Sequence, residues 1–154
     1  MSNEADVRAL HEALDDEYRA WATYDQVIRD FGPTLPFTRI LASEERHIDA
    51  LRTLFVRYGL AMPENPWPGN VPRYSSLQDA CKAGVAAEIA NARMYDRLLT
   101  EAAREDIFKV LSNLRDASQQ RHLPAFQRCA KRPSDSNEGH GGMRRRRRAG
   151  RSRA

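Results

Sequence analysis

The sequence ASEERHIDAL, residues 42–51, places two polar side chains inside an apolar helical stripe. The apolar members of that stripe are Phe37, Ile40, Ile48, Leu51 and Phe55, and with Glu44 they follow one another in steps of three or four positions. This spacing is typical of one face of an α-helix, and it predicts a helix over residues 36–59. Glu44 and His47 lie on the same face, where a core helix would carry apolar residues. The stretch therefore predicts a buried carboxylate and a buried imidazole.

The same periodicity predicts three more helices, over residues 5–31, 76–102 and 105–130. Gly32 and Pro33 end the first, Gly59 ends the second, and Ser75 or Ser76 can cap the start of the third. Pro124 interrupts the fourth helix and predicts a kink there. The expected fold is all-α, with one globular domain over residues 1–130.

The connections between the helices restrict the topology. Short breaks after the first and third helices favour antiparallel neighbours. Residues 61–73 hold four prolines, and about 13 extended residues at roughly 3.3 Å each span about 40 Å, the length of a helix. An antiparallel four-helix bundle with a long crossover between helices two and three is therefore expected. A plain up-down-up-down bundle is the alternative.

Three of the stripes carry a glutamate near the middle of the helix, at Glu17, Glu44 and Glu88. Burying unpaired carboxylates costs several kcal/mol each, and no lysine or arginine in these stripes can neutralise them. A divalent metal ion would neutralise these carboxylates. Glu44 and His47 form Glu-x-x-His, whose two side chains share a helix face, and His122 adds a second imidazole from the fourth helix. The alternative is a metal-free hydrogen-bonded network with some carboxylates protonated, involving Tyr24, Tyr95 or Ser118.

Four segments carry a resemblance to a known family: ALDDEYRAWATYDQVIRDFGPTLPF (13–37), ASEERHIDAL (42–51), AEIANARMYDRLL (87–99) and ASQQRHLPAF (117–126). Over roughly residues 9–130, this chain resembles an uncharacterised, domain-of-unknown-function branch of the ferritin-like superfamily of di-iron carboxylate four-helix bundles. The resemblance implies an all-α bundle with a two-metal site. Iron is the implied metal, and another divalent ion is the alternative.

In that family plan, two helices give one glutamate each and two give Glu-x-x-His. Glu17 and Glu88 match the single ligands, and Glu44 with His47 matches the first pair. The fourth helix departs from the plan, because Gln119 stands three residues before His122 where a glutamate is expected. Gln119 is a weak ligand, so the second iron position is in doubt.

The net charge of +4 comes from the C-terminal tail, since residues 131–154 hold nine Lys/Arg and two acidic residues. The remainder of the chain is mildly acidic. The tail includes five consecutive arginines, and its Ser/Gly/Arg-rich composition predicts disorder. The arginine run suggests a polyanion as a second partner.

Cys81 and Cys129 each lie seven residues from a proposed ligand, Glu88 and His122, on helices expected to be antiparallel. They should therefore meet at one end of the bundle. Two interpretations are open: two small buried thiols, or a reversible disulfide.

The N-terminus is acidic and has no signal-peptide pattern, and no apolar window is long enough for a membrane span, so we expect a cytoplasmic protein. The predicted function is a metal-binding, ferritin-like protein that reacts with oxygen or peroxide or handles iron, as a ferroxidase-like or peroxide-reacting oxidoreductase. A homo-oligomer is compatible with this function. The alternative is a non-catalytic helical scaffold that binds polyanions through its arginine tail.

Overall fold

The computed structural model describes residues 3–132, and this part of the chain is helical throughout apart from its connections. The elements are α1 (Glu4–Phe31), α2 (Phe37–Arg57), α3 (Leu77–Glu101), α4 (Glu105–Ala117), a π-helical turn η1 (Ser118–His122) and α5 (Leu123–Lys131). α4, η1 and α5 follow one another without a gap, so they form the fourth helical segment. No strand occurs within residues 3–132. The all-α prediction is confirmed, whereas the predicted tail lies outside the described residues from residue 133 onward.

Local sequence signals account for the ends of the helices. The Asn3 side chain accepts a hydrogen bond from the Ala5 amide, and Ser76 accepts one from the Asp79 amide, which satisfies backbone donors that a helix start leaves free. At the end of α1, Gly32 has a φ of 86°, a conformation that favours glycine. The predicted helix boundaries agree with these ends to within about two residues.

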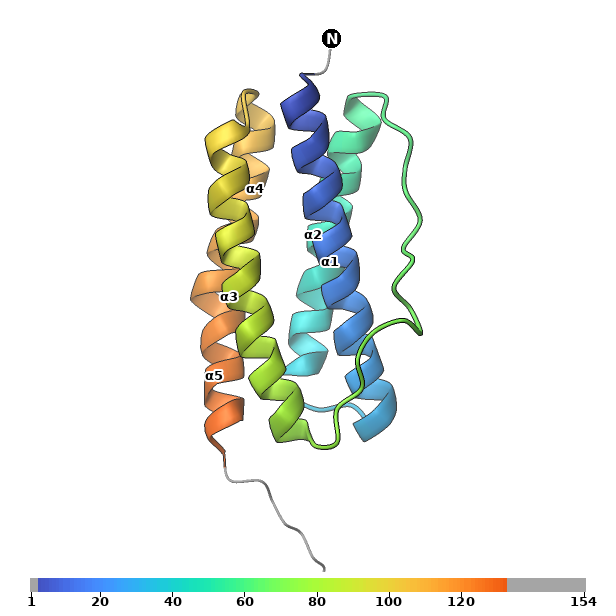
Figure 1. Ribbon diagram of the computed structural model, residues 1–154, viewed down its shortest axis with the longest axis vertical. Coiled ribbons are helices and arrows are strands. Elements are labelled where there is room, and N and C mark those ends of the chain that lie inside the picture. Colours follow the sequence, from blue (N-terminus) through green and yellow to red (C-terminus); the bar gives the residue numbers. More distant parts are fainter. Residues whose placement is uncertain (1–2, 133–154) are drawn as a thin grey trace, which may run out of the picture.

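Figure 1 shows how the helices are arranged. α1 and α2 run side by side in opposite directions, and α3 runs opposite to α4 and α5 (Figure 1). The connection from Tyr58 to Ser76 runs along the outside of the bundle, so α2 and α3 point the same way (Figure 1). This connection is tied to α1, because the Tyr18 hydroxyl donates to the Pro63 carbonyl at 2.7 Å and the Trp67 indole donates to Asp15 at 2.9 Å.

The apolar core consists of two separate clusters. The first cluster lies between the first half of α1, the second halves of α2 and α3, and α4; it includes Leu14, Leu51, Leu98 and Leu111. The second cluster lies at the other end of the bundle, against α5; it includes Tyr24, Phe37, Cys81 and Phe126. On each of the four helical segments, buried polar residues separate the two clusters.

α3 and α5 approach each other closely in the second cluster. A Cβ atom added at Gly84 would lie 2.7 Å from the Phe126 ring, so only glycine fits at this contact. One turn along α3, Cys81 forms a disulfide with Cys129 of α5, with a Cα–Cα distance of 5.7 Å. The two cysteines thus meet as predicted, and they form the disulfide, one of the two interpretations that the sequence left open.

None of the helices within residues 3–132 combines the length and apolar character needed to cross a bilayer.

Candidate metal centre

The structure gathers the five predicted ligands into one buried layer between the two apolar clusters. The exposed fractions of these residues are 2% for Glu17, 2% for Glu44, 8% for His47, 3% for Glu88 and 3% for His122. They come from α1, α2, α3 and η1, so each of the four helical segments contributes. Helical periodicity explains this convergence, because each residue continues the inward-facing stripe of its own helix.

The ligand atoms form two groups that share one residue. Glu17, Glu44 and His47 make up the first group, and Glu44, Glu88 and His122 make up the second. Within each group the ligand atoms lie within 4.8 Å of one another. Because Glu44 has one oxygen for each group, it can bridge two metal ions.

The distances confirm that the two oxygens of Glu44 face different histidines. His47 Nδ1 is 3.3 Å from Glu44 Oε2 and 3.5 Å from Glu17 Oε2. His122 Nδ1 is 3.2 Å from Glu44 Oε1 and 3.4 Å from Glu88 Oε1. Each Nδ1 atom thus points at two carboxylate oxygens.

Three atoms in this layer test whether a metal fits. Glu44 Oε2, His47 Nδ1 and His122 Nδ1 are buried and form no hydrogen bond, although each nitrogen lies within ion-pair distance of a carboxylate. Buried polar atoms in folded proteins are almost always paired, so such a cluster requires an explanation. Carboxylate oxygen and imidazole nitrogen are ligands for iron, manganese and zinc, and a cation would satisfy all three atoms together. The residues present therefore fit a metal centre.

The other nitrogen of each histidine faces a residue that the sequence analysis did not identify. Ser43 Oγ lies 2.9 Å from His122 Nε2 and 3.3 Å from His47 Nε2. A hydroxyl oxygen has two lone pairs, so it can accept a hydrogen bond from both rings. Protons on both Nε2 atoms leave both Nδ1 lone pairs free for metal. Ser43 precedes His47 by one helical turn, and this four-residue spacing is the feature of the sequence that could have indicated a contact between the two side chains.

Hydroxyl groups from three helical segments hold the outer carboxylates. The Tyr95 hydroxyl donates to Glu17 Oε1 at 2.5 Å, and the Tyr24 hydroxyl donates to Glu88 Oε1 at 2.9 Å. Ser118 Oγ donates to Glu88 Oε2 at 2.5 Å. Burial, together with the adjacent carboxylates, raises the pKa of both phenols well above the usual range, so they remain donors. Such hydrogen bonds orient ligands and are typical of the surroundings of metal sites.

The pKa values show what stabilises the layer in the metal-free protein. Burial and the neighbouring Glu44 carboxylate raise the pKa of Glu17 to about 8. Burial acts to lower the pKa of both histidines, but the facing carboxylates outweigh it and raise the pKa to about 10 for His47 and about 9 for His122. Burial acts to raise the pKa of Glu44, but the close polar contacts with Glu17 and with the two histidines outweigh burial and lower this pKa. Near neutral pH the metal-free layer therefore carries protons that a metal would have to displace.

The structure corrects the prediction that Gln119 is a weak metal ligand. Gln119 is exposed, whereas Ser118 and His122 on either side of it are buried. The reason is the π-helical turn Ser118–His122, which has more residues per turn than an α-helix, so inward positions lie four apart and not three. This irregular turn ends two residues before Pro124, whose missing amide hydrogen disfavours a regular α-helix there. The fourth segment thus offers a serine hydroxyl to Glu88 and one histidine to the candidate metal centre.

Comparisons with known proteins identify similar structures. No family model and no curated protein matches the chain. The hypothetical protein MJ0754 of Methanococcus jannaschii has a similar crystal structure, with a TM-score of 0.74 and 25% identity over 84% of this chain and 81% of that chain. The conserved hypothetical protein rv2844 of Mycobacterium tuberculosis also shares the fold, with a TM-score of 0.69 and 20% identity over 84% of this chain and 93% of that chain.

Proposed function

We propose that this chain is a ferritin-like metalloprotein that holds two divalent metal ions, with iron as the metal, in the layer between its two apolar clusters. One observation carries the proposal: the buried atoms Glu44 Oε2, His47 Nδ1 and His122 Nδ1 form no hydrogen bond. The two histidine nitrogens lie beside different oxygens of the same Glu44 carboxylate. The ligand set also supports it, because glutamates from three helices and one Glu-x-x-His pair match most of the family plan.

Each residue has a defined task in this proposal. Glu17 and His47 would hold one ion, Glu88 and His122 the other, and Glu44 would bridge them. When bound, two iron ions would supply redox chemistry toward oxygen or peroxide. The apolar clusters shield the layer from water at both of its ends along the bundle, and this strengthens the electrostatic contacts within it.

The charges of the layer are compatible with two divalent ions. Three carboxylates give the ligand set a charge of minus three when ionised, and the two histidines bind metal in the neutral form. Near neutral pH, loading would therefore release the protons that Glu17, His47 and His122 hold in the metal-free protein. The absence of a carboxylate ligand on the fourth helical segment leaves more positive charge on the centre than the complete family plan would.

An anaerobic titration of the full-length, metal-free protein with Fe(II) tests the proposal. We expect two Fe(II) per chain, followed by oxygen consumption when air is admitted. The double variant His47→Ala/His122→Ala should bind neither ion, whereas His11→Ala, at an exposed histidine of α1, should bind both. Equal iron binding by all three proteins would refute the site. Absence of iron binding by the unaltered chain would favour the alternative of a non-catalytic scaffold.

A further inference from the structure

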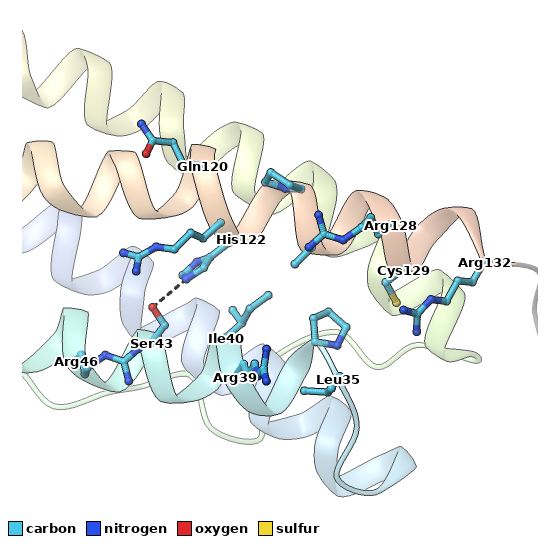
Figure 2. A pocket seen from close by; sticks show the side chains of 14 residues that line it. Leu35, Arg39, Ile40, Ser43, Arg46, Gln120, His122, Arg128, Cys129 and Arg132 are labelled. Carbon is cyan, nitrogen blue, oxygen red and sulfur yellow. Dashed lines mark hydrogen bonds between the residues drawn. The ribbon is translucent and has the colours of Figure 1, made fainter.

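A pocket of about 560 Å³ opens between the first half of α2 and the segment formed by η1 and α5. Its volume falls in the range of small-molecule sites in proteins. Figure 2 shows side chains from both walls, with Ser43 of α2 hydrogen-bonded to His122 of η1. Since Ser43 and His122 also belong to the metal layer, the pocket and the candidate metal centre share a wall.

Five arginines line this pocket. Two come from α2 and three from the opposite segment: Arg39, Arg46, Arg121, Arg128 and Arg132. The lining includes no acidic side chain. Within residues 3–132, none of the five forms an ion pair with a carboxylate.

Most arginines elsewhere in residues 3–132 behave differently. Seven of these ten pair with an aspartate or glutamate: Arg19, Arg29, Arg57, Arg73, Arg97, Arg104 and Arg115. The described part of the chain therefore pairs most of its other arginines internally but leaves all five around this pocket without an ion-pair partner. A concave surface lined by one sign of charge concentrates ions of the opposite sign. Guanidinium groups also match the geometry of carboxylate and phosphate oxygens.

The remaining lining indicates the size and character of the ligand. Leu35, Pro36, Ile40, Pro124 and Ala125 supply apolar surface between the arginines. An inorganic ion would leave this surface unused, whereas a duplex nucleic acid is too wide for a pocket of this volume. The combination fits a small organic molecule with anionic oxygens and a short apolar body.

We propose that this pocket binds a small organic oxyanion, a carboxylate or phosphate ester, next to the metal layer. Arginines from both walls hold its charged groups, and the apolar residues hold its body. The identification of this anion as a reactant of the metal centre rests on the proposed function. The anion site itself does not, because no metal ligand other than His122 lines the pocket.

Calorimetric titration of the full-length protein tests the site with two probes, phenyl phosphate and benzoate, at low salt. The double variant Arg39→Gln/Arg128→Gln removes one guanidinium from each wall, and we expect it to bind the preferred probe at least about tenfold more weakly. Binding by the unaltered protein should also weaken as salt rises, because screening shortens the reach of exposed charges. A preference for one probe identifies which oxyanion the arginines favour.

The control is Arg8→Gln/Arg93→Gln, at two exposed arginines that do not line the pocket. Equal weakening in both double variants would overturn the proposal, as would binding of neither probe. Binding of a single-stranded oligonucleotide without either probe would also overturn it in favour of a nucleic-acid surface. Repeating the titration with metal-free Glu44→Gln protein separates the two proposals, because that variant should lose metal and retain the anion.

Discussion

Replacing Glu44 with glutamine should remove both metal positions at once, because its two oxygens face different histidines at 3.3 and 3.2 Å. Glu17→Gln and Glu88→Gln should each remove only one, since each residue belongs to one group. The expected stoichiometries are two ions for the unaltered chain, one for either outer variant and none for Glu44→Gln. Glutamine preserves the shape of the side chain and has a good helix propensity, so the fold should persist.

Thermal unfolding measures how much bound metal stabilises the folded protein. At a free metal concentration of about 100 times the dissociation constant, each site stabilises the folded state by roughly 2.7 kcal/mol. For a helical domain of this size, 1 kcal/mol raises the melting temperature by about 4 °C. Metal should therefore raise the melting temperature by about 20 °C for the unaltered chain, by about 10 °C for each outer variant, and by close to zero for Glu44→Gln.

Glu45→Gln is the matched control, because Glu45 is the next residue on the same helix and is exposed. This variant should bind two ions and show the full rise in melting temperature. One tight ion retained by Glu44→Gln would show that Glu44 is not shared. Loss of both ions in Glu17→Gln or Glu88→Gln would contradict the division into two groups.

Three further changes have defined outcomes. In the metal-free protein the pKa is about 10 for His47 and about 9 for His122, so both side chains are protonated at pH 7. Metal affinity should therefore rise with pH up to about 10, because metal competes with these protons. Calorimetric titrations in buffers of different ionisation enthalpy should detect the protons that metal binding releases. Ser43→Ala should weaken metal binding by roughly 10–100-fold with unchanged helix content by circular dichroism, since both Nε2 groups lose their partner; unchanged affinity would remove Ser43 from the site. Cys81→Ser/Cys129→Ser should lower the free energy of unfolding by about 3–4 kcal/mol, given the 48-residue separation, and denaturant unfolding with and without a reductant measures this.

The sequence predicts the helices and the buried positions of the main candidate ligands, for a simple physical reason. Glu17, Glu44 and Glu88 stand in otherwise apolar stripes, and a helix that continues its period must carry them inward. The loop lengths restrict which helices are neighbours. These features depend only on local periodicity and chain reach, which the amino-acid sequence contains.

Other features of the site depend on departures from the regular α-helix or on contacts between helices. The exposed position of Gln119 results from the π-helical turn, and periodicity of 3.6 residues cannot reveal it. Ser43 is one of many small polar residues until the structure places it between two imidazoles. The arginines of the pocket recur at seven-residue spacing on each wall, Arg39 with Arg46 and Arg121 with Arg128, yet only the packing of the two helices brings the pairs together.

The division of the apolar core into two clusters has a consequence for how the molecule unfolds. The layer between them contributes few apolar contacts, so each cluster is held together largely by its own side chains. Such a bundle can open at one end while the other remains folded. The disulfide and the Gly84–Phe126 contact secure α3 to α5 at the end that contains the second cluster. Ions held by all four helical segments would couple the two ends, and metal loading would thereby make unfolding a single cooperative event.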